Sequence, residues 1–367
     1  MTFISVDGHQ SSVDSRTVLS TLFHAWERRL ASASDGDRVV RPFEWGLDWI
    51  RPNGHPAATR PYSIVDAWVQ QALADSVSFF DAPPTAAYRF VPDNSKRDSA
   101  SDGLLTFPSA INTPHPENDL VHARYIPARG THRGRRRRAV LVLPQWNSDE
   151  AGHLGLCRIL AHVGISALRL SLPYHDRRMP PELSRADYIV SANVARTVQV
   201  CRQAVLDSRR AIAWLAGRGY ERIGILGTSL GSCLALLTAA HEPLIRAQAL
   251  NHISPFFADV VWEGLSTAHV RAGLERHINL EALRTLWLPI SPQCYLERVR
   301  SKKTLLVYAK YDLTFPVRLS RALVDEFRRR EIPHEVAVLP CGHYSAGKAP
   351  FKYLDAWILI RFLARNL

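Results

Sequence analysis

The segment Gly227–Gly231, with the sequence GTSLG, constrains the fold of this chain more than any other feature. It follows an apolar run at residues 222–226 that predicts a strand, and it precedes a run of small and apolar residues at 232–240 that predicts a helix. Gly-x-Ser-x-Gly between a strand and a helix is typical of a very tight turn around the serine. The turn is so tight that the flanking positions must be nearly free of side chains, which is why they are glycines. Such a turn would expose the Ser229 hydroxyl at a helix N-terminus, where backbone N–H groups favour negative charge.

A serine hydroxyl is a weak nucleophile until a base removes its proton, and the base needs an orienting acid. The apolar run at residues 304–309 predicts a buried strand, and Asp312 follows it. The run at 335–339 predicts the next strand, and it leads into Gly342 and His343. Catalytic groups in open α/β sheets gather at the carboxyl ends of strands. We therefore predict Ser229 as nucleophile, Asp312 as acid and His343 as base.

Each of these residues also has a purely structural interpretation. Ser229 and Asp312 could cap the helices that follow them, and His343 is one of 15 histidines in the chain. His252, at the end of the strand after residues 232–240, is a second candidate for the base, although it precedes the acid in chain order. Asp325 lies within a predicted helix and is a poor candidate for the acid.

The segment Gly227–Gly231, Asp312 in the sequence YDLTFP and the pair Gly342-His343 make the chain resemble the α/β-hydrolase superfamily, from about Leu104 to Leu367. The resemblance implies a mostly parallel central sheet covered by helices on both faces, and a serine hydrolase of the esterase or lipase type. A narrower resemblance, to the α/β-hydrolase domain-containing protein 18 family, is carried by Leu172-Pro173-Tyr174, with Arg177 nearby, and by residues 342–346.

The superfamily also implies an oxyanion hole, a pair of backbone N–H groups that bind the negative oxygen of the tetrahedral intermediate. One donor should be Leu230, directly after the nucleophile. The other should come from the loop after the third strand, where Pro144–Asn147 replaces the usual glycine-rich sequence. By position we predict Trp146, with Gln145 as the alternative. Asp259 is an alternative acid, because some hydrolases draw the acid from the strand after the nucleophile.

The chain divides into an N-terminal helical extension with a polar linker, residues 1–103, and a catalytic domain, residues 104–367. In the extension, Thr17–Leu30 has helical spacing, and Ser63 resembles a capping residue that opens a helix through Phe80. Residues 254–299, between two core strands, predict a small cap. Further strands are expected at 104–111, 120–126, 139–143, 167–172 and 247–253, and further helices at 155–163, 193–216, 315–330 and 351–363.

The net charge of +12 would suit an acidic partner, and much of it lies in the run His132–Arg138. We interpret this run as a solvated loop, since no recognition-helix or zinc-finger pattern accompanies it, and we expect no nucleic-acid partner. The alternative to an enzyme is a non-catalytic binding protein that uses this basic loop for an acidic partner. Titration with anionic lipid or nucleic acid at two salt concentrations separates the two functions.

Five scattered cysteines without C-x-x-C spacing favour a reducing compartment and argue against a zinc site, and Cys341 is interpreted as a space-filling residue. No phosphate-binding glycine loop suggests a nucleotide, so we expect no cofactor and no metal. No run is long enough for a transmembrane segment and no secretory signal is recognised, so a cytoplasmic enzyme is expected. Its partner would be a small-molecule or lipid-like acyl substrate; the acyl length and the oligomeric state are open.

Overall fold

The structure is a computed structural model, and it describes residues 11–33, 37–50, 60–93, 102–129 and 137–367. Most of the basic run His132–Arg138 and most of the polar linker before residue 103 lie outside the described residues. Among the described residues, no helix combines the length and the apolar character needed to cross a membrane.

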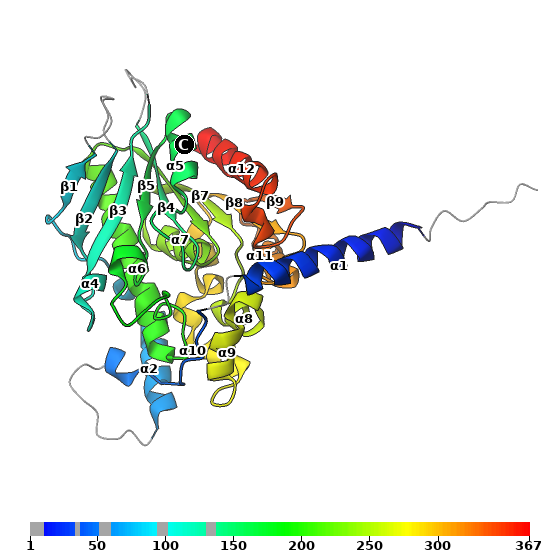
Figure 1. Cartoon of the computed structure of the whole chain (residues 1–367). Coiled ribbons are helices and arrows are strands. Elements are labelled where there is room, and N and C mark those ends of the chain that lie inside the picture. The colour runs from blue at the N-terminus through cyan, green and yellow to red at the C-terminus, as the bar shows by residue number, and fades with distance from the viewer. Residues whose placement is uncertain (1–10, 34–36, 51–59, 94–101, 130–136) are drawn as a thin grey trace, which may run out of the picture.

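Within the described ranges, one nine-stranded sheet forms the centre of the molecule (Figure 1), with the strand order β1-β2-β3-β5-β4-β6-β7-β8-β9. The strands are β1 Arg89–Pro92, β2 Gly103–Pro108, β3 Leu120–Ile126, β4 Arg138–Leu143, β5 Ser166–Leu170, β6 Arg222–Thr228, β7 Ile245–Asn251, β8 Lys303–Ala309 and β9 Glu335–Leu339. From β5 to β9 all neighbours are parallel, whereas β1, β2 and β3 are joined to the sheet by antiparallel pairings. The mostly parallel sheet is therefore confirmed.

Helices cover both faces of this sheet because its central strands are apolar on both sides. The α-helices are α1 Ser11–Ser32, α2 Pro61–Ala74, α3 Ser76–Phe79, α4 Pro116–Asp119, α5 Leu154–His162, α6 Val194–Gly217, α7 Leu230–His241, α8 Phe257–Glu263, α9 Ala268–Leu274, α10 Leu280–Leu286, α11 Val317–Arg329 and α12 Phe351–Asn366. In β4, Val140 and Val142 pack with α5 and α12 on one face, whereas Leu141 and Leu143 pack with α6 and α7 on the other. The alternation along one strand thus separates two cores.

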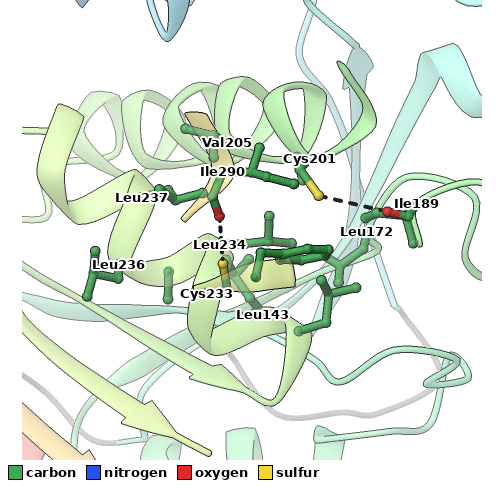
Figure 2. Packing of buried hydrophobic residues seen from close by; sticks show 14 of the residues in the cluster. Leu143, Leu172, Ile189, Cys201, Val205, Cys233, Leu234, Leu236, Leu237 and Ile290 are labelled. Carbon is green, nitrogen blue, oxygen red and sulfur yellow. Dashed lines mark hydrogen bonds between the residues drawn. The ribbon is translucent and has the colours of Figure 1, made fainter. Parts of the chain in front are cut away.

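The larger core lies on the face covered by α6 and α7, and Figure 2 shows part of it from close by. Cys201 of α6 and Cys233 of α7 are buried there among leucine side chains, and each thiol points at a backbone carbonyl oxygen, that of Ile189 and of Ile290 respectively. Burial raises the pKa of both thiols, so they act as small apolar residues. Cys341 is likewise fully buried.

Residues 254–299, between β7 and β8, fold into a series of short helices rather than into core strands. Besides α8, α9 and α10 they form the 3-10 helices η3 Leu265–Thr267, η4 Leu288–Ile290 and η5 Pro292–Val299. Three further 3-10 helices are η1 Leu47–Trp49, η2 Asp176–Arg178 and η6 Ser345–Gly347. Short helices between two core strands are compatible with the small cap that the sequence predicts here, and the role of these residues as a cap stays a prediction.

The N-terminal part contains the predicted helices, but it also supplies strand β1, Arg89–Pro92, to the central sheet, which the helical extension did not anticipate. Its second helix also differs from the expectation. The helix does not open at a Ser63 cap: α2 begins at Pro61, after Arg60, which provides no side-chain cap. It also does not run unbroken to Phe80, because the chain leaves the helical conformation at Asp75, whose side chain accepts a hydrogen bond from the N–H of Ser78 and starts α3. Proline at the first turn fixes the start without a capping side chain.

Candidate active site

The turn at Ser229 has the strained geometry that its flanking glycines predict. Ser229 has φ 55° and ψ −119°, between the end of β6 and the start of α7. A Cβ atom on Gly227 would lie 2.1 Å from the carbonyl oxygen of Gly231, and one on Gly231 would lie 2.2 Å from the carbonyl oxygen of Leu143. The backbone N–H of Ser229 donates to the carbonyl oxygen of Asn251 at 2.7 Å. The turn is therefore clamped between β4 and β7, where larger residues would not fit.

Asp312 is buried just beyond the carboxyl end of β8, and its carboxylate is fully engaged. Its Oδ1 accepts hydrogen bonds from the backbone N–H groups of Thr314 (2.8 Å) and Phe315 (2.7 Å). Its Oδ2 lies 3.1 Å from Nδ1 of His343 and 2.9 Å from Nδ1 of His252. Burial by itself would raise the pKa of this carboxyl, but the positive charge of His343 and the bonds from both imidazoles outweigh it and hold the pKa well below its usual range.

His343 and His252 thus share one carboxylate oxygen, and their ring centroids are 4.6 Å apart. His343 lies in the loop after β9, stacked on Phe315. His252 directly follows β7, has φ 59° and is 2% exposed. The structure therefore brings together the predicted acid and base, and it places the second candidate base on the same acid.

The three ligand atoms of His252, Asp312 and His343 lie within 4.8 Å of one another, which is close enough for a metal ion. This grouping was not predicted, since 60 residues separate His252 from Asp312 and 31 separate Asp312 from His343. However, both Nδ1 atoms face one oxygen at ordinary hydrogen-bond distances, so the arrangement serves as a hydrogen-bonded cluster without any ion.

The loop that carries His343 is held by the N-terminal helix. Glu27 of α1 is fully buried, and its carboxylate accepts hydrogen bonds from the N–H groups of Tyr344 (2.8 Å) and Ser345 (2.9 Å). Gly342 must lack a side chain here, because a Cβ atom would lie 2.2 Å from the Glu27 carboxyl carbon. Phe23, one turn earlier on α1, stacks on Tyr311 at 4.4 Å. The N-terminal helix therefore contacts both the loop that carries His343, called the base loop below, and the loop that carries Asp312.

The loop after β4 is fixed by contacts on both sides. The indole N–H of Trp146 donates to the carbonyl oxygen of Ala186 at 2.8 Å, and the ring stacks on His269 of α9. Burial lowers the pKa of His175 to about 4, so its ring is neutral. Its Nδ1 atom lies 2.9 Å from the carbonyl oxygen of Pro173. With its proton on Nδ1, the neutral ring accepts the backbone N–H of Asn147 at Nε2, 3.0 Å away. Backbone donors in this loop therefore have a defined orientation.

A cavity of about 1340 Å³ opens at this edge of the sheet, and Ser229, Leu230, Trp146, His252 and His343 all contribute to its lining. Ser229 is 7% exposed. The cavity wall also includes the alternative oxyanion donor Gln145. The predicted nucleophile, base and two oxyanion donors thus meet at one cavity, with the acid buried behind the base.

The two other candidate acids are engaged elsewhere. Asp259 of α8 forms two hydrogen bonds with the guanidinium of Arg284, at 2.5 and 3.1 Å. Asp325 lies on α11 and forms an exposed ion pair with Arg328. Neither contributes to the lining of the cavity that holds Ser229.

Sequence reasoning missed three side chains that shape the site. Glu27 gave no signal, since a glutamate in an amphipathic helix is usually solvated. His175 lies in a loop without a recognisable motif, yet its ring orients the loop after β4. The Nε2 atom of His153 lies 3.0 Å from the hydroxyl of Thr228, the residue before the nucleophile, and burial lowers the pKa of this histidine to about 4.

Known proteins share the architecture of this chain at low sequence identity. The acetyl xylan esterase from Paenibacillus sp. R4 superposes with a TM-score of 0.60 and 17% identity over 88% of this chain and 99% of that chain. Acetyl xylan esterase 1 from Thermoanaerobacterium sp. JW/SL YS485 gives 0.57 and 16% over the same shares. The Pyrococcus horikoshii acylaminoacyl peptidase gives 0.56 and 13% over 76% of this chain and 42% of that chain.

No family model and no curated protein matches the sequence, so the narrower resemblance to the α/β-hydrolase domain-containing protein 18 family receives no support. The structural matches and the strand order agree in one conclusion. The chain has the α/β-hydrolase fold, with a nine-stranded, mostly parallel sheet and an N-terminal helix.

Proposed function

We propose that this protein is a serine hydrolase that cleaves carboxylic esters through an acyl-enzyme. The observation that carries the proposal is the strained turn at Ser229, which opens on the same cavity as His343, whose ring is hydrogen-bonded to the buried Asp312. A capping serine would need neither the strain nor these partners, because any ordinary helix start satisfies a cap.

In the proposed reaction the Ser229 hydroxyl attacks the carbonyl carbon of the ester, and Nε2 of His343 takes its proton. Asp312 stabilises the imidazolium that forms, since its Oδ2 faces Nδ1 of His343. The tetrahedral intermediate collapses, the alkoxide leaves with the proton from His343, and the acyl group stays on Ser229. Water, activated by the same histidine, then hydrolyses the acyl-enzyme and restores the serine.

The negative oxygen of the intermediate would be bound by the backbone N–H groups of Leu230 and Trp146. The first turn of α7 packs directly on the chain that leads to Trp146: a Cβ atom on Gly231 would lie 2.5 Å from the carbonyl oxygen of Pro144. This contact supports the assignment, because it sets the first turn of α7 against the segment that leads to Trp146. The clamped ring of Trp146 would keep its N–H in place while charge develops.

A small-molecule or lipid-like ester is the substrate class that this cavity suits. Its volume of about 1340 Å³ exceeds the roughly 300–1,000 Å³ of most small-molecule sites, so it could admit an acid part larger than acetyl. An alkoxide also needs less help to leave than an amine. Two of the proteins with the same fold are acetyl xylan esterases, which favours esters, and a third is an acylaminoacyl peptidase, which makes amides the second class to test.

The proposal is tested by labelling with a fluorophosphonate, which reacts only with activated serines. The wild type should be labelled, and Ser229→Ala and His343→Ala should not. Ser208→Ala is a matched control, because Ser208 is a buried serine of α6 whose hydroxyl donates to the carbonyl oxygen of Ala204. Labelling should persist in EDTA. A folded wild type that is not labelled, or a Ser229→Ala variant that still is, would refute the proposal.

A further inference from the structure

His252 is a buried imidazole to which the proposed reaction gives no task. It lies directly beyond β7, contributes to the wall of the cavity and is 2% exposed. Its Nδ1 is as close to Oδ2 of Asp312, at 2.9 Å, as that of His343, at 3.1 Å. A histidine that only filled space would not need to compete with the base for the oxygen of the catalytic acid.

We propose that His252 is a positioning residue for the acid–base pair: it donates a hydrogen bond to Oδ2 of Asp312, fixes the carboxylate towards His343, and limits how much of the carboxylate's negative charge faces the imidazole of His343. The inference rests on the proposed function, since it concerns the same reaction. His252 acts through Asp312, and it takes no proton from the serine.

The geometry supports this task because the carboxylate is held at both oxygens. Oδ1 receives two backbone N–H groups, from Thr314 and Phe315, which set the position of that oxygen. Oδ2 could still rotate out of the plane that suits His343, and the hydrogen bond from His252 opposes that rotation. A carboxylate with four donors has a single orientation, and catalysis depends on such orientation because a small misplacement of the base slows the reaction.

The backbone of His252 is itself anchored to the elements that carry the site. Its N–H donates to the carbonyl oxygen of Val307 in β8 at 2.8 Å. Its carbonyl oxygen accepts the hydroxyl of Ser232, in the first turn of α7, at 2.6 Å, and the same hydroxyl is also 2.6 Å from the carbonyl oxygen of Ser229. The second imidazole is therefore tied to the nucleophile turn and to the strand that leads to the acid.

The charges around His252 determine the sign of its effect. Burial would lower its pKa, but the hydrogen bond and charge of Asp312, with the more distant Asp355 and Glu27, raise it above the usual value. The ring of His343, which is also titratable, lies against that of His252. Because His252 draws on the negative charge of Oδ2, less of that charge stabilises the imidazolium of His343. Removing His252 should therefore strengthen the interaction between Asp312 and His343 and move the acid limb of labelling to higher pH.

The test is the rate constant of fluorophosphonate labelling from pH 5 to 9 for the wild type, His252→Gly and His252→Asn. Both variants tolerate a positive φ, and the asparagine amide can donate where Nδ1 of the imidazole does. For His252→Gly we expect a plateau about 10-fold lower and an acid limb about 0.5–1 pH unit higher. His252→Asn should recover the wild-type plateau rate, because the amide of asparagine restores a hydrogen-bond donor to Asp312. It should keep part of the shift of the acid limb, because the amide carries no positive charge.

His241→Asn is the matched control: it replaces a partly buried histidine at the end of α7, whose Nδ1 faces the carbonyl oxygen of Leu237, and should leave the profile unchanged. An unlabelled wild type would overturn the proposed function and this inference with it. A labelled wild type whose profile coincides with that of His252→Gly would overturn the inference alone. If His252→Gly fails to fold, the inference would also be overturned by a His252→Asn variant whose acid limb coincides with that of the wild type.

Discussion

The two halves of the candidate site are built in different ways. The nucleophile turn is local: one strand, five residues and one helix place Ser229, and the two glycines are needed because their neighbours are backbone atoms. The acid–base half is assembled from distant segments, with Asp312 after β8, His343 after β9, His252 after β7 and Glu27 in α1. A local motif can be recognised in the sequence, whereas the assembled half depends on contacts that no short segment encodes.

The largest effect is expected where the local half is broken at its backbone. Gly231→Ala would place a Cβ atom 2.2 Å from the carbonyl oxygen of Leu143. This oxygen belongs to β4, so it cannot move away without disturbing the sheet. We expect a loss of about 3 kcal/mol in the free energy of unfolding and no fluorophosphonate labelling. Gly155→Ala in α5 is the control, since a Cβ atom there meets nothing within 4 Å. Urea unfolding of both variants gives the comparison; equal stabilities would refute the backbone argument.

Next in size is the removal of the carboxylate that holds the base loop. Glu27→Ala leaves the buried N–H groups of Tyr344 and Ser345 without their acceptor, so we expect about 2 kcal/mol lower stability and roughly 10-fold slower labelling. Glu27→Gln keeps one acceptor oxygen and should be intermediate. Leu22→Ala, on the exposed side of the same helix, is the control. A Glu27→Ala variant labelled at the wild-type rate would show that the base loop does not need α1.

This contrast also explains what the sequence could predict. The periodicity of apolar residues predicted most strands and helices within a few residues, and the order of Ser229, Asp312 and His343 predicted which strand ends would meet. Glu27 could not be foreseen, because the spacing that marks α1 as a helix does not say which side chain it buries or against what. His252 was noticed, but only the packing of β7 beside β8 shows that it reaches the acid rather than the nucleophile. The division at residue 103 stays a prediction.

A smaller effect is expected from the charge of the assembled half, since the nucleophile turn itself carries no titratable side chain. The pKa of Asp312 is depressed in the folded protein, so its ionised form contributes stability above the unfolded pKa of about 4 and loses it as the pH falls. The stability difference between wild type and Asp312→Asn should widen from pH 7 to 5, because the raised pKa of His252 depends on the charge of Asp312. It should then shrink by about 1.5 kcal/mol towards pH 3, as the carboxyl of the unfolded wild type takes up its proton. Urea unfolding at each pH measures it. A difference independent of pH would mean that Asp312 is not held ionised by its two imidazoles.

The smallest effect concerns how residues 254–299 are joined to the base loop. The hydroxyl of Tyr344 accepts a hydrogen bond from the guanidinium of Arg38 at 2.9 Å and lies 2.7 Å from the hydroxyl of Ser266 in η3. The Ser266 hydroxyl in turn lies 2.7 Å from the hydroxyl of Thr314. Tyr344→Phe should cost about 1 kcal/mol, because these partners are only partly buried and water can replace the hydroxyl.

The coupling between Tyr344 and Ser266 can be isolated by a double-mutant cycle with Ser266→Ala. Because the two hydroxyls are in direct contact, the double variant should lose about 0.5–1 kcal/mol less than the sum of the single variants. Labelling rates should change less than twofold, since the carboxylate of Glu27 still holds the backbone of this loop. Strict additivity would mean that the short helices between β7 and β8 and the loop that carries His343 are held independently of each other.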